Sequence, residues 1–170
     1  MCFFLLAGLS FRLGDHGRYP SLAKKLRDSE LMNPVLDRAN EIVSTTNTTD
    51  FVVQSHSGDT LLLTGSFDHS FYHEVEIHFH VVSYIGLPTH GIDSPRFSIA
   101  THSERNLRKH LELEETDILY CIHTDPELGG RNRYYVAAER MSVVEGIVFY
   151  YHRENLKPGE RIAEWVNREG

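Results

Sequence analysis

Residues 69–80 read HSFYHEVEIHFH, which places four histidines and two glutamates among regularly spaced apolar side chains. Successive side chains of a β-strand point to opposite faces of the sheet, so this alternation predicts a strand with one buried and one solvated face. The buried face is expected to carry Val75, Ile77, Phe79 and Val81, and the solvated face Glu74, Glu76, His78 and His80. This pattern is typical of an antiparallel sheet that packs on one side only.

Strand patterns continue on both sides of this segment. Residues 51–56 and 60–67, separated by a Ser-Gly-Asp turn, predict a β-hairpin. Beyond a loop rich in glycine and proline, further strands are expected at residues 96–101, 117–124 and 133–139. Residues 141–152, MSVVEGIVFYYH, predict two more strands around a turn at Glu145-Gly146. The second half of the chain is therefore expected to be rich in sheet.

Four segments carry helix signals. A short helix is expected after Ser21, and a second helix should run from Pro34 to about residue 44, because asparagine followed by proline favours a helix start. Apolar residues recur at helical spacing in the second helix and should pack on the sheet: Val35, Leu36, Ala39, Ile42 and Val43. A middle helix is expected at about residues 102–112 and a short C-terminal helix at residues 157–167.

At 170 residues the chain has the size of one ordinary domain. The expected fold class is α+β: a single domain with a mostly antiparallel sheet, N-terminal helices, one middle helix and a short C-terminal helix. This domain should span residues 15–170. Residues 1–14 form an apolar N-terminal segment of uncertain order, which is open to three interpretations: a signal peptide, a buried edge strand, or residues upstream of the native start.

The formal net charge of −7 at neutral pH disfavours partners with a phosphate backbone. The densest basic group, Arg131, Arg133 and Arg140, is too small to override this charge. The apolar start of the chain is too short to span a membrane. Cys2 and Cys121 have neither a disulfide nor a zinc-knuckle spacing, so a reducing cytoplasm is the expected location. We therefore expect neither a nucleic acid nor a membrane as partner.

Residue identities exclude several catalytic motifs. His73-Glu74 begins like the HExxH helix of zinc proteases, but Ile77 occupies the position of the second histidine. Asp68-His69-Ser70 contains the residue types of a hydrolase triad, yet sequence neighbours point in directions too different for a proton relay. The chain also has no GxSxG, Walker or GxGxxG motif, so these enzyme classes have no local support.

A metal site remains possible on the solvated face of the strand. Alternate residues lie about 6.6 Å apart, so His78 and His80 can approach one ion, whereas Glu76 and His80 are about 13 Å apart. A third ligand would have to come from another strand, and His123 or His56 are the candidates. Zinc or another divalent first-row metal would suit such ligands. The simpler interpretation is a solvated face without any cofactor, on which the neighbouring glutamates would raise the pKa of His78 and His80.

These observations lead to two hypotheses about function. The favoured one is a small acidic, non-enzymatic protein-binding module, whose partner is another protein or a second copy of the chain. The alternative is a metal-dependent enzyme or metal-binding protein that uses His78, His80, Glu76 and His123. The first rests on polar and aromatic surface without a complete catalytic constellation, and the second on the His-x-His pair.

Overall fold

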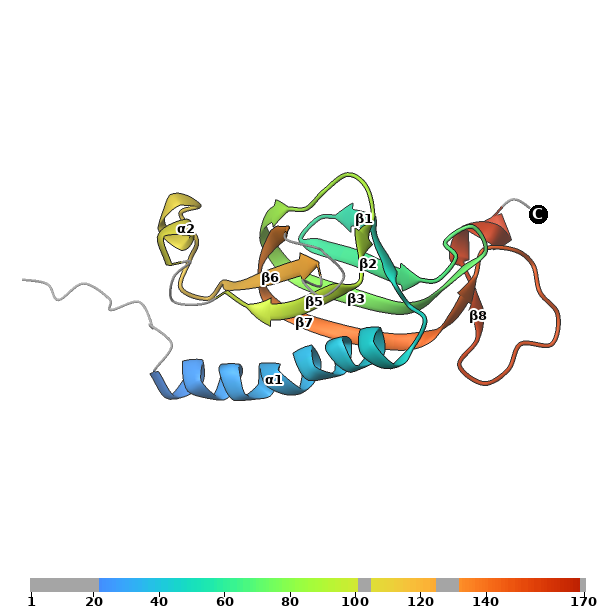
Figure 1. Cartoon of the computed structure of the whole chain (residues 1–170), viewed down its shortest axis with the longest axis horizontal. Coiled ribbons are helices and arrows are strands. Elements are labelled where there is room, and N and C mark those ends of the chain that lie inside the picture. Colours follow the sequence, from blue (N-terminus) through green and yellow to red (C-terminus); the bar gives the residue numbers. More distant parts are fainter. Residues whose placement is uncertain (1–21, 101–104, 125–131, 169–170) are drawn as a thin grey trace, which may run out of the picture.

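The computed structural model describes residues 22–100, 105–124 and 132–168, and its strands form one sheet in the order β4-β1-β2-β3-β7-β6-β5 (Figure 1). The neighbours in this order pair antiparallel, and the short β8 pairs with β7 in parallel. The strands are β1 (Asp50–Ser57), β2 (Thr60–Ser66), β3 (Tyr72–Gly86), β4 (Ile92–Asp93), β5 (Pro95–Ile99), β6 (Ile118–Thr124), β7 (Arg133–Phe149) and β8 (Arg161–Ile162).

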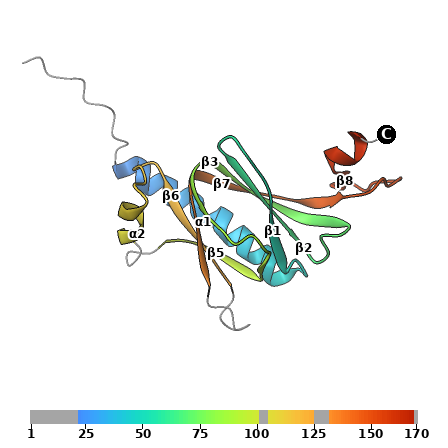
Figure 2. The same cartoon turned by 90° about the horizontal axis from the view of Figure 1, so that it is seen from above.

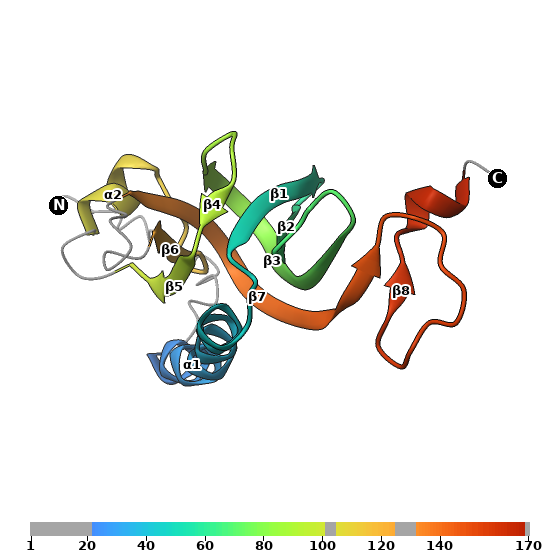
Figure 3. The same ribbon diagram turned by 45° about the vertical axis from the view of Figure 1, so that its right-hand side comes forward.

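The sheet curves into a nearly closed barrel because its two ends are neighbours in the chain. Only Ser94, at a φ of 43°, separates β4, which pairs with β1, from β5, which pairs with β6. The two ends also meet in the core, where the rings of Phe51 and Phe97 lie edge to face at 5.8 Å. One continuous segment therefore supplies the strands at both ends of the sheet, β4 and β5 (Figure 3).

The two longest strands, β3 and β7, pair along their length at the centre of the sheet. Tyr72 lies opposite Phe149 at one end of this pair, and Gly86 lies opposite Tyr135 at the other. The alternation predicted for β3 is confirmed for Val75, Ile77 and Phe79, which are at most 1% exposed. It is wrong for Glu76, which was expected on the solvated face but is buried, and for Val81, which is 41% exposed and has a φ of 54°. A β-branched residue rarely adopts this conformation, and the alternation breaks here.

One long helix, α1 (Leu22–Thr45), replaces the two expected N-terminal helices, and Pro34 lies inside it. A proline inside a helix removes one backbone hydrogen bond without necessarily ending the helix. The predicted packing face is confirmed, because Leu36, Ala39 and Ile42 are buried in the core. The helix contacts β5 and β7, as Figure 2 shows.

A side chain of α1 also covers the open edge of the sheet. The amide of Asn40 accepts a hydrogen bond from the Phe97 N–H at 2.8 Å and donates one to the Phe97 carbonyl at 2.9 Å. The two hydrogen bonds reproduce what a neighbouring strand would offer the edge of β5. The helix therefore closes the side of the barrel that β5 would otherwise leave open.

The hairpin predicted at residues 51–67 is confirmed by β1 and β2. The turn predicted at Glu145-Gly146 is wrong, because β7 runs through it as one strand. Gly146 has a φ of 143°, and an added Cβ would lie 2.6 Å from the Gly159 carbonyl oxygen. Glycine is thus required here for close packing and an unusual backbone angle, not for a turn.

The α+β fold class is therefore wrong, since the described residues form mostly antiparallel sheet in a nearly closed barrel with two α-helices. The second of these, α2 (Arg105–His110), is shorter than expected. The expected C-terminal helix is replaced by β8 and a single 3₁₀ turn at Glu164–Arg168, because Arg161 and Ile162 pair with the end of β7. Neither α-helix is both long and apolar enough to cross a membrane within the part of the chain that the structure describes.

Candidate functional site: the C-terminal arm and Glu76

The chain leaves the barrel at the end of β7 and forms what we call the C-terminal arm, residues 150–166. Figures 1 and 2 show this arm, with β8, lying beyond the barrel at the end of the β3–β7 pair. Two backbone hydrogen bonds fix its ends: the Tyr150 N–H donates to the Phe71 carbonyl, and the Ala163 N–H donates to the Phe149 carbonyl. The arm is therefore attached to the starting end of β3 and the final end of β7.

Glu76 of β3 connects the arm to the barrel. The residue is 8% exposed, and its carboxylate accepts hydrogen bonds from His73 Nε2 at 2.9 Å and His78 Nε2 at 3.2 Å. It also forms an ion pair with the guanidinium of Arg161 in β8. Burial raises the pKa of Glu76, but the hydrogen bonds from His73, Arg161 and His78 outweigh burial and lower the pKa to about 2. Glu76 is therefore an ionised carboxylate whose charge is matched by the arm.

The hydrogen bonds of His73 extend this cluster to Tyr150. His73 is 2% exposed, and its Nδ1 lies 2.9 Å from the Tyr150 hydroxyl. Because an ionised carboxylate only accepts hydrogen bonds, His73 Nε2 donates to Glu76, and in the tautomer that carries its proton on Nε2 the Nδ1 atom accepts from the Tyr150 hydroxyl. Burial raises the pKa of Tyr150, so this hydroxyl stays protonated and acts as the donor. The chain of hydrogen bonds orders Tyr150 and leaves it a weak nucleophile.

The structure brings only some of the predicted metal-ligating residues together. Glu76 and His78 are hydrogen-bonded, but the His80 ring stacks on His78 at 6.1 Å and its Nε2 lies 3.2 Å from the Ser142 hydroxyl. His123 lies on β6 opposite Arg133 of β7. His78 of β3 lies opposite Ser142 of β7. Ser142 and Arg133 are nine residues apart, which is about 30 Å along a strand, so His123 lies far from His78.

Within the described ranges, no group of three or more His, Cys, Asp or Glu side chains is arranged to hold a metal ion. The other candidate ligand, His56, lies on β1 opposite Leu61 of β2. Strand β2 therefore separates His56 from the histidines of β3. The expectation about His80 is also wrong in direction. Burial, followed by the positive charges of Arg140 and His78, lowers the pKa of His80 below its ordinary value, although Asp59 opposes this. Arg140 of β7 lies opposite His80 of β3. The prediction from the sequence took into account only the glutamates on the strand of His80 itself.

Aromatic side chains gather on the arm and on the loop that precedes β3. Phe71 is 55% exposed, and Tyr151 and Trp165 are 43% and 45% exposed. The Trp165 ring lies 5.2 Å from the ring of Tyr150, and the Phe71 carbonyl accepts the Tyr150 N–H. We call Phe71, Tyr151 and Trp165 the aromatic surface. Tyr151 packs on Phe149 and Trp165 on Tyr150, so the aromatic side chains lie at the same end of the molecule and pack on different neighbours. Exposed aromatic residues are enriched at protein interfaces.

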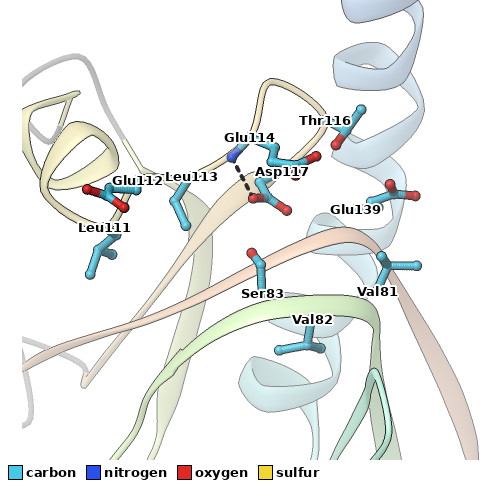
Figure 4. A pocket seen from close by; sticks show the side chains of 10 residues that line it. All are labelled: Val81, Val82, Ser83, Leu111, Glu112, Leu113, Glu114, Thr116, Asp117 and Glu139. Carbon is cyan, nitrogen blue, oxygen red and sulfur yellow. Dashed lines mark hydrogen bonds between the residues drawn. The ribbon is translucent and has the colours of Figure 1, made fainter.

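A separate pocket of about 330 Å³ lies at the opposite end of β3, between the break at Val81 and the loop after α2. Figure 4 shows that Glu112, Glu114, Asp117 and Glu139 contribute carboxylates to its lining. The carboxylate of Asp117 accepts the Glu114 N–H at 2.9 Å, so this buried side chain holds the loop in shape. The contribution of Asp117 is structural, and the remaining carboxylates belong to exposed side chains.

Sequence patterns identified Glu76 and His78 but missed His73, Tyr150 and Arg161. A bulge in the β3–β7 pairing lies between His73 and Val75. Strict alternation therefore does not predict on which face of the sheet the His73 side chain lies. The sequence pattern places Arg161 in a terminal helix, in which pairing with β7 is impossible. An isolated arginine before an apolar residue gives no signal of its carboxylate partner.

No known protein family, curated protein or solved structure matches the chain. The arrangement of its side chains must therefore support any functional conclusion.

Proposed function

We propose that the protein is a non-enzymatic protein–protein interaction module that self-associates through the aromatic surface of its C-terminal arm. The observation that carries this proposal is the exposure of Phe71, Tyr151 and Trp165, about half of each side chain, at one end of the molecule. Tryptophan and tyrosine contribute more than most residues to binding energy at interfaces. Arg153 lies over the Phe149 ring at 4.3 Å, and arginine is likewise enriched among the residues that contribute most to binding energy.

The distribution of charge favours a second copy as the partner. Residues 150–166 contain three cations, Arg153, Lys157 and Arg161, and three anions, Glu154, Glu160 and Glu164, so their formal charge is zero. The rest of the chain carries the whole formal charge of −7. Two acidic copies repel one another least where the arms meet, because the arm is the neutral part of an acidic molecule.

The chemistry of Glu76 supports binding rather than catalysis. Its carboxylate already accepts from two histidines and one arginine, and Tyr150 is kept protonated. These groups order the arm, and because each is already engaged in hydrogen bonds, none of them is free to act as a general base. We also propose a cytoplasmic location, which the spacing of Cys2 and Cys121 in the sequence supports.

Sedimentation equilibrium over a wide range of protein concentration tests self-association. The wild-type protein should change from monomer to dimer, and Phe71→Ser combined with Tyr151→Ser should weaken the dimer at least tenfold, because it removes two exposed aromatic anchors. Val53→Ser is the matched control, since Val53 is 43% exposed on β1, away from the arm. A wild-type protein that stays monomeric at millimolar concentration contradicts the proposal, as does an equal effect of the control.

A further inference from the structure

We propose that two copies exchange the ends of their C-terminal arms, so that Arg161 of one copy pairs with Glu76 of the other. This inference rests on the proposed self-association and specifies its geometry. Each Glu76 site would then be completed by the partner copy. Residues 151–158 would act as the hinge, and residues 159–166, which we call the tip, would be the exchanged element.

The contacts that hold the tip are few and specific. Arg161 pairs with Glu76, β8 adds two residues beside Val148 and Phe149, and the Trp165 ring packs near Tyr150. The Ala163 N–H also donates to the Phe149 carbonyl. The groups that hold the tip belong to β3, to the end of β7 and to Tyr150, the first residue of the arm, which precedes the hinge. A tip from another copy can make the same contacts, because none of them depends on the hinge that connects the tip to its own barrel.

The hinge itself makes little contact with the barrel. Its residues are exposed, except for Arg153, which is intermediate. Arg153 and Tyr151 contact the Phe149 ring, at 4.3 Å and 5.5 Å. The backbone hydrogen bonds of Lys157 stay within the arm, where its N–H donates to the Glu160 carboxylate and its carbonyl accepts the Glu160 N–H. Eight extended residues span about 27 Å, so the hinge can reach a barrel that lies against its own.

Glu76 makes an undocked tip unfavourable. If the tip leaves, the carboxylate of the buried Glu76 keeps hydrogen bonds to His73 and His78 but loses its only arginine partner among the described residues. A buried charge without its countercharge is costly, so an opened copy must dock a tip again. In an exchanged pair both Glu76 sites are filled, and the two aromatic surfaces are brought close together as additional contact.

A charge-reversal pair tests the exchange. Glu76→Lys leaves two cations facing each other within one copy, and Arg161→Glu leaves two carboxylates. When the two variants are mixed, exchange brings the two native side chains together at one site and the two introduced side chains, of opposite charge, together at the other. We expect each variant alone to dimerise weakly, and the mixture to give a one-to-one heterodimer in more than tenfold excess over both homodimers by native mass spectrometry, with one variant labelled with nitrogen-15.

The control is the chain that carries both substitutions, which restores a matched pair and should dimerise like the wild type. A statistical mixture of dimers would overturn the exchange while leaving self-association intact. A wild-type protein without dimers would instead overturn the proposed function. Because Trp165 is the only tryptophan, its fluorescence reports on docking of the tip in every variant.

A second variant keeps the proposal testable if Glu76→Lys does not fold. Removal of residues 152–158 leaves four residues between β7 and β8, too few for the two chain reversals that parallel pairing within one copy requires. Exchange predicts a dimer that persists on dilution, with Trp165 docked. A monomer with Trp165 docked would contradict it.

Discussion

At the scale of single residues, the charge of Glu76 should dominate the acid stability of the protein. The pKa of this carboxyl is lowered to about 2, whereas an unfolded glutamate titrates near 4.3. A folded pKa below the unfolded one adds stability that is fully present above the unfolded pKa and is lost as pH falls through the folded one. We expect the free energy of unfolding to fall between about pH 4.3 and pH 2, and Glu76→Gln to make this fall smaller.

Urea unfolding measured at several pH values checks this expectation. Glu154→Gln is a suitable control, because Glu154 is exposed in the hinge. An equally steep loss of stability in Glu76→Gln and in the control would contradict the role assigned to Glu76.

Single residues also show where sequence reasoning succeeds and where it fails. Alternation predicts the burial of Val75, Ile77 and Phe79 because a regular strand has a fixed period. It fails at Val81, which has a positive φ, and at Glu76, which was expected on the solvated face but is buried close to the bulge between His73 and Val75. Such irregularities depend on the partner strand, and β7 lies more than fifty residues away in the sequence. The pairing of Glu76 with Arg161 was hidden for the same reason.

At the scale of elements, the attachment of α1 to the sheet depends on one side chain as well as on apolar packing. Asn40→Ala removes both hydrogen bonds to the Phe97 backbone and exposes the edge of β5. We expect the free energy of unfolding to fall by about 1–3 kcal/mol, because polar groups that lose their partners in a partly buried place carry this cost. Asp37→Ala, an exposed position on the same helix, should change it by less than about 0.5 kcal/mol.

Urea denaturation of both variants checks the attachment. Equal stability of the two would show that Asn40 does not hold the helix. The apolar face of α1 could be predicted because Leu36, Ala39 and Ile42 recur at helical spacing. The hydrogen bonds of Asn40 could not, since nothing local distinguishes an asparagine that caps a distant strand from one that faces water.

At the scale of the whole molecule, closure of the barrel is the feature that sequence patterns cannot supply. The hairpin of β1 and β2 is local, and its turn residues reveal it. Closure instead joins β1 to β4 and β5 to β6 across a single residue, Ser94. A short irregular stretch between two turns gives no signal that it belongs to both ends of one sheet. The α+β prediction failed because separate helices were expected where the chain closes or extends this sheet.

The same architecture predicts two levels of stability within one chain. The centres of β3 and β7 pair along their length and bury Ile77 and Phe79, whereas β8 adds only two residues at the end of β7. Amide protons at Ile77 and Val143 should therefore exchange with solvent only through global unfolding, and those at Ile162 and Ala163 through local release of the tip. Arg161→Gln should accelerate exchange in the tip at least tenfold, because the substitution removes the ion pair with Glu76. Exchange at Ile77 still requires global unfolding and should stay far slower than exchange at Ile162 in both proteins. Amide exchange followed by NMR on dilute, monomeric protein measures both regions in one experiment. If Ile77 and Ile162 show the same opening free energy in the wild-type protein, the tip and the barrel open as one unit, and the tip is too firmly part of the fold to be exchanged.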